Sequence, residues 1–204
     1  MTAQTPAVPG RPAAESVDER AVGSASSSVT GMTLFVASEA VFFAAFLGIY
    51  ANSYTAADNW PPPGMPAPSL VVPSVALVIL LLSGVAMTRC LRRMHQAAYP
   101  AGLAPWLLTV FAGSVLFSAL VAVTMTGTGF GIGDGIYQSL YFVMTGLELA
   151  HGIGGAVLLG LLLVRLRTGE LALRRDPLQA AAIYWYFVIV LGVVLYAVLD
   201  LAVQ

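Results

Sequence analysis

The chain has 204 residues, of which 58% are hydrophobic and only 9% charged, and its mean hydropathy is +0.85. A soluble globular domain carries roughly 25% charged residues, so this composition excludes a soluble protein and predicts a membrane protein. All nine basic residues are arginines that form no basic block, so nucleic acid is not an expected partner.

The first segment, residues 1–28, is predicted to be a disordered N-terminal tail. It is rich in Ala, Pro, Ser, Thr and Val, carries charges of both signs and shows no apolar periodicity. This polar tail leads into a full-length apolar span instead of a short one, so we do not expect it to be a cleavable signal. Residues 29–204 are then predicted to form one membrane domain.

Five apolar segments are long enough to cross a bilayer, whose ~30 Å hydrocarbon core needs ~20 residues of helix. We place them at about 30–53, 69–90, 103–125, 136–166 and 180–203. The predicted fold class is therefore all-α, a multi-pass membrane protein with a bundle of five transmembrane helices.

The charges of the connecting segments predict the orientation. The first and third links, 54–68 and 126–135, contain Asp58 and Asp134 but no arginine, whereas the other two links are flanked by arginines. All nine arginines lie on one side if the N-terminus is inside and the C-terminus outside, as the positive-inside rule favours. In the first link, Trp60 and the three prolines after it predict a stiff, non-helical surface loop.

Three ionisable side chains lie well inside the spans: Glu39, Glu148 and His151. An acidic residue at the centre of a membrane helix costs ~2.5–3.5 kcal/mol on insertion scales, so each should face the bundle interior and have a partner. Asp200 is near the end of the last span and needs no such partner. Glu39 is either a protonated carboxyl bonded to a neighbouring helix or a group that exchanges or stores protons.

Glu148 and His151 are three residues apart, which places them on one side of a helix. We interpret them as an intramembrane polar pair, a glutamic acid hydrogen-bonded to a histidine. The same Glu-x-x-His spacing occurs in di-iron bundles, but such a site needs a second motif and more carboxylates, and no metal is expected. Cys90 is interpreted as a small apolar residue. No catalytic or redox signature is present, and the chain alone has little with which to do redox chemistry.

Four separate motifs along residues 30–204 resemble subunit III of the haem–copper oxidases, the cytochrome c oxidase family, in its short five-helix bacterial form. They are Leu34–Phe43 with Glu39, Trp60-Pro61-Pro62, Ile132–Gly146 at the start of the fourth span, and Tyr184–Val188. The resemblance places Glu39 at the family's carbodiimide-reactive glutamate. It implies a buried carboxyl near a lipid cleft between the first two helices and the other three.

The sequence departs from the family at polar positions. Glu148 replaces the first histidine of a Thr-Gly-Phe-His-Gly-Leu-His motif, of which His151 is the second. Tyr186 and Ile189 replace a histidine and an aspartate, and Thr124 stands where a glutamate is usual. Of these intramembrane polar positions, only Glu39 and His151 match the family pattern.

The resemblance implies a non-catalytic subunit of a cytochrome c oxidase in the bacterial plasma membrane. It would stabilise subunit I, support proton uptake and bind phospholipid, with subunits I and II as partners. No cofactor is expected in this chain, because haem and copper would be held by the partner subunits. The alternatives are a paralogue that aids assembly or stability of an oxidase or a nitric oxide reductase, and a small channel or transporter.

Overall fold

The computed structural model describes residues 15–64, 69–94, 102–169 and 176–201, with side chains from residue 27 onward. Its helices are α1 (Glu15–Ala56), α2 (Val71–Met94), α3 (Ala104–Thr126), α4 (Ile136–Arg167) and α6 (Asp176–Leu195), the last continued by the π-helical segment η1 (Tyr196–Leu201). Five stretches of helix in these ranges are long and apolar enough to cross a membrane. This confirms the predicted all-α class and the five spans, whose ends are close to those expected.

The first helix begins earlier than predicted. It starts at Glu15, inside the segment 1–28 for which we expected disorder. The predicted boundary between residues 28 and 29 therefore does not coincide with the start of the helix. No proline lies between Pro12 and Pro61, and residues 15–28 include good helix formers such as Ala, Glu and Arg, which allow the membrane helix to continue upstream. The rest of the predicted tail, 1–14, lies outside the described residues.

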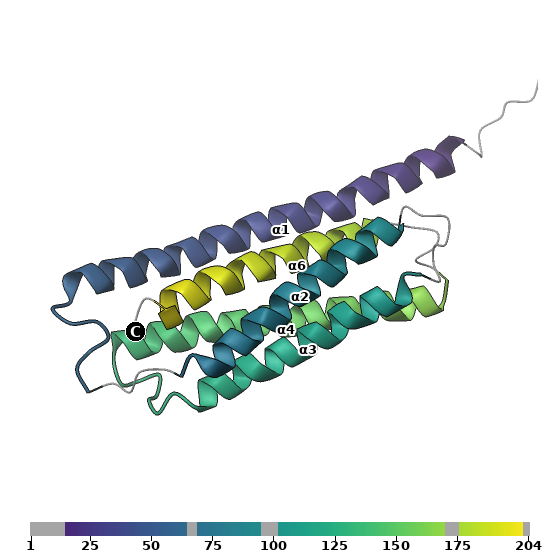
Figure 1. The fold of residues 1–204 in the computed structure, drawn as a ribbon. Helices are drawn as coiled ribbons and strands as arrows, with labels where there is room; N and C mark the ends of the chain where they lie inside the picture. Colours follow the sequence, from purple (N-terminus) through teal and green to yellow (C-terminus); the bar gives the residue numbers. More distant parts are fainter. Residues whose placement is uncertain (1–14, 65–68, 95–101, 170–175, 202–204) are drawn as a thin grey trace, which may run out of the picture.

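The helices form a bundle in which α6 occupies a central position. It contacts α1, α2 and α4, while α3 lies against α2 and α4 (Figure 1). Helix α1 runs along the outside of α6. Only 6% of its most apolar stretch is buried, against 33–44% in the other four helices. We expected a cleft between the first two helices and the other three. In the described residues α2 instead packs directly on α3 and α6, so this expectation is wrong.

Close packing at the centre depends on one tryptophan of α6. The Trp185 side chain is fully buried, and its indole Nε1 donates a hydrogen bond of 2.9 Å to Ser83 Oγ on α2. The ring lies against α4 at Gly155, where an added Cβ would be 2.5 Å from the Trp185 ring. Small residues let membrane helices approach closely and pack by van der Waals contact. Trp185 therefore joins α2, α4 and α6.

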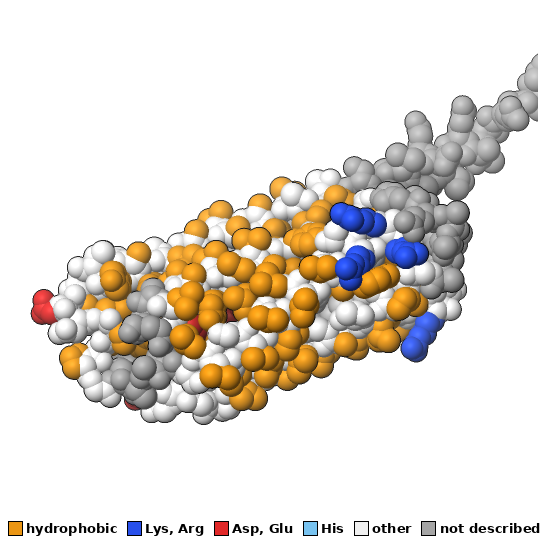
Figure 2. Space-filling model, viewed as in Figure 1, with side chains coloured by type: hydrophobic (Ala, Val, Ile, Leu, Met, Phe, Trp, Pro, Cys, Tyr) orange, Lys and Arg blue, Asp and Glu red, His pale blue; other side chains and the backbone are white. Residues whose placement is uncertain are grey.

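The basic side chains of the described residues gather at one end of the bundle. Arg92 and Arg93 lie in the last turn of α2, and Arg165 and Arg167 in the last turn of α4. Figure 2 shows the basic side chains gathered at one end, with acidic side chains at the other. Arg89 lies over the Trp106 ring, 4.9 Å from its centroid. The predicted orientation, with the N-terminus inside and the C-terminus outside, depends on this grouping of the arginines at one end of the bundle.

At the opposite end, Trp60 and the three prolines after it lie in a non-helical loop, residues 57–64, as predicted. Trp60 donates a hydrogen bond of 3.0 Å from its indole Nε1 to Tyr50 Oη, and this hydroxyl donates to the Val198 carbonyl oxygen at 3.3 Å. The Trp60 ring also meets that of Tyr137 edge to face, with centroids 5.3 Å apart. The loop is thus tied to α1, α4 and η1.

Candidate functional site

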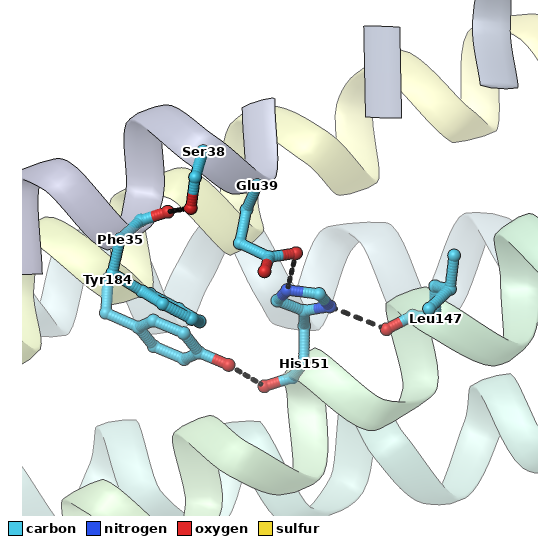
Figure 3. Close-up of polar contacts among 6 residues, drawn as sticks. All are labelled: Phe35, Ser38, Glu39, Leu147, His151 and Tyr184. Carbon is cyan, nitrogen blue, oxygen red and sulfur yellow. Dashed lines mark hydrogen bonds and ion pairs between the residues drawn. The ribbon is translucent and has the colours of Figure 1, made fainter. Parts of the chain in front are cut away.

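Two of the predicted intramembrane residues meet between α1 and α4. Glu39 Oε2 lies 3.3 Å from His151 Nε2, and the other ring nitrogen, Nδ1, lies 2.7 Å from the Leu147 carbonyl oxygen (Figure 3). His151 has 9% of its side chain exposed and Glu39 has 24%. A carboxyl group of the outermost helix is therefore anchored on a buried imidazole of the bundle.

The contacts of His151 show which of its ring nitrogens donates to the backbone. A carbonyl oxygen only accepts, so Nδ1 of His151 must carry a hydrogen and donate it to Leu147. The Glu39 carboxyl oxygen faces the other ring nitrogen, Nε2, at 3.3 Å. An imidazole nitrogen and a carboxyl oxygen at this distance can exchange a proton.

Aromatic residues surround the imidazole and hold it in place. The Tyr184 hydroxyl donates a hydrogen bond of 2.9 Å to the His151 carbonyl oxygen, and its ring stacks on the imidazole with centroids 6.2 Å apart. Phe43 and Phe187 contact the imidazole edge to face, at 5.4 and 5.8 Å between centroids. Two of these residues, Tyr184 and Phe187, belong to the final-helix motif of the sequence, which thus has a structural role at the pair.

The partial exposure of Glu39 leads to a first prediction. Because its carboxyl group lies on the outer helix and is 24% exposed, a hydrophobic carbodiimide dissolved in the lipid should reach and label it. Glu39→Gln removes the reactive acid but keeps the shape, so labelling should be lost while the bundle stays folded. Mass spectrometry of labelled peptides measures this, with Glu148→Gln as the matched control that should still be labelled at residue 39. Unchanged labelling of the Glu39→Gln chain would contradict this assignment.

The predicted pairing of Glu148 with His151 is wrong. Both nitrogens of His151 are engaged by Glu39 and Leu147, and within the described part of the chain Glu148 has no hydrogen bond to a protein group. The physical reason is the helical repeat, since residues three apart differ by about 60° around the axis. That angle suffices to point the two side chains at different neighbours.

Glu148 instead points towards α6. An added Cβ at Gly192 would lie 3.2 Å from Glu148 Oε1, and Glu148 lines a cavity of about 30 Å³ that Asp200 also lines. Asp200 is only 8% exposed. The expectation that this residue, near the end of its span, need not face the bundle interior was therefore wrong. The π-helical segment η1 carries it into the bundle.

The sequence positions that depart from the family pattern have new partners. Thr124 lines the same cavity as Glu148. The hydroxyl groups of Tyr186 and Thr88 are 2.8 Å apart and form a hydrogen bond between α6 and α2. Ile189 fills the space beside Gly84, where an added Cβ would be 2.7 Å from its Cδ1. The substituted positions are therefore packed within the bundle.

Among the described residues, no group of three or more His, Cys, Asp or Glu side chains is arranged to hold a metal ion. Cys90 is buried and has a free thiol. The site is thus defined by carboxyl groups, one imidazole and tyrosine hydroxyls, which are groups that bind and pass protons.

Five apolar helices around buried acids and a histidine define a multi-pass membrane protein with an intramembrane polar site. The family described as cytochrome c oxidase subunit III matches residues 20–201. Proteins named cytochrome c oxidase subunit 3 are similar over 173 residues, 35% identical in Struthio camelus and 34% in Homo sapiens, covering 81% of this chain and 66% of each relative. The chain belongs to the cytochrome c oxidase subunit III family, and its match spans slightly less than two thirds of those relatives.

Proposed function

We propose that this chain is subunit III of a cytochrome c oxidase, a non-catalytic integral membrane subunit of an aerobic respiratory chain. The observation that carries this proposal is the family match over residues 20–201, nearly the whole membrane domain. The similar proteins are named as the oxidase subunit itself, which favours this role over the paralogue that assists assembly. Subunits I and II would be its partners and would hold the haem and copper.

In this role the chain would stabilise subunit I and support its proton uptake. The Glu39–His151 pair supports the second part, because it places a carboxyl oxygen 3.3 Å from an imidazole nitrogen inside the membrane, and both groups can bind and release protons. Phospholipid is the other proposed partner. The arginines at the ends of α2 and α4 suit contact with lipid phosphates, and with the N-terminus inside they would face the cytoplasm of a bacterium.

Purification of the tagged full-length protein from native membranes in mild detergent tests the proposal. Mass spectrometry should identify oxidase subunits I and II, and a reduced-minus-oxidised visible spectrum should show a-type haem in the same fraction. A tagged, unrelated multi-pass protein from the same membranes is the control and should bring down neither. A haem-free fraction without subunits I and II would overturn the proposal.

A further inference from the structure

A second group of buried acids lies away from the Glu39–His151 pair. Its cavity, of about 30 Å³, is lined by the first turns of α2, the later turns of α3, the first half of α4 and the end of α6 with η1. The polar residues that line it are Glu148, Asp200, Thr124, Thr145, Tyr141 and Tyr196. Neither Glu39 nor His151 lines it, so this is a separate place in the bundle.

Glu148 is the side chain that points to a ligand here. It is nine-tenths buried, its Oε1 is directed towards Gly192 across the cavity, and within the described residues it has no hydrogen bond to a protein group. Buried polar groups are nearly always hydrogen-bonded, to water where protein groups are missing. A cavity of this volume exceeds the ~10–15 Å³ that a water molecule needs, and its walls supply several polar partners.

The charges around the cavity decide which ligand fits. Its titratable groups are Glu148, Asp200, Tyr141 and Tyr196, and among the described residues no arginine or histidine lines it. Asp200 acts electrostatically on the Glu148 carboxyl group. Two carboxylates that share a poorly solvated site without a basic neighbour do not both ionise, and they hold a proton between them.

We propose that Glu148 and Asp200, with water in the cavity between them, form an intramembrane proton-binding site. The site holds one proton shared by two carboxyl groups of α4 and η1. It is separate from the Glu39–His151 pair and does not depend on which complex the chain joins. The Tyr196 hydroxyl is 2.6 Å from Ser74 Oγ on α2, and this residue also lines the cavity.

Infrared spectroscopy of the full-length chain in lipid tests this site through the C=O stretching band of protonated carboxylic acids. The background is Glu39→Gln, so that the other buried acid does not contribute. At neutral pH this protein should show the band, and deuterium oxide should shift it. Glu148→Gln or Asp200→Asn alone should change its position, because one acid remains in an altered site, and the two substitutions together should abolish it.

Three results would overturn the proposal: no such band in the Glu39→Gln protein at neutral pH, a band that survives the combined Glu148→Gln and Asp200→Asn substitutions, or a band that sodium or potassium ions remove at constant pH. The last result would mean that the carboxylates hold a metal cation. If the combined variant does not fold, the two single variants decide the question, since unchanged band positions in both would equally exclude these residues.

Discussion

Trp185→Ala should lower the free energy of unfolding by about 3–5 kcal/mol, the range for removing a large aromatic side chain from a protein core. The side chain is fully buried and contacts two other helices, α2 and α4. Inside a membrane the loss is mainly one of van der Waals packing, because lipid is as apolar as the core. Ser83 keeps its hydrogen bond of 2.6 Å to the Leu80 carbonyl oxygen, so its hydroxyl group still has a hydrogen-bond partner.

Two further variants separate packing from hydrogen bonding. Trp185→Phe keeps most of the ring and loses the indole donor, so it should cost about 0.5–1.5 kcal/mol beyond the change in size. Val190→Ala, on the same helix but 62% exposed, should change stability by less than about 0.5 kcal/mol. Reversible unfolding in mixed micelles measures all three. Equal stability of the Trp185→Ala and Val190→Ala proteins would mean that α6 does not pack on α2 and α4 as described.

The number and ends of the helices could be predicted because they depend on the length of apolar runs. Five such runs separated by proline, glycine and charged residues determine five spans. The upstream start of α1 could not be predicted in the same way. Residues 15–28 are mostly polar. They are helical because they extend the helix that the apolar membrane segment already forms.

Side-chain partners were harder to predict, because these helices are apolar on all sides. A helix with one polar face shows which side is buried, but a membrane helix gives no such pattern. Sequence spacing therefore suggested a partner for His151 on its own helix, whereas its partner is Glu39, on a helix far away in the sequence. Asp200 was overlooked for a related reason. Its place near a helix end suggested the membrane surface, but η1 directs it inward.

Removing His151 should destabilise the bundle more than removing Glu39. In Glu39→Leu, the imidazole keeps its Nδ1 hydrogen bond to Leu147 and loses only the contact at Nε2. In His151→Leu, the Glu39 acid loses its imidazole partner inside the membrane. An unsatisfied buried polar group costs about 1–3 kcal/mol, and we expect Glu39→Leu near the lower end of this range and His151→Leu near the upper end.

The double variant tests whether these costs come from one contact. If Glu39 and His151 interact directly, Glu39→Leu with His151→Leu should cost less than the sum of the single changes, by about 1–2 kcal/mol. Carbodiimide labelling adds a reading that general instability would not produce. In folded His151→Leu protein the Glu39 carboxyl is no longer in contact with the imidazole, so the carbodiimide should reach it more easily and labelling should increase. Additive costs together with unchanged labelling would show that the two side chains do not interact directly.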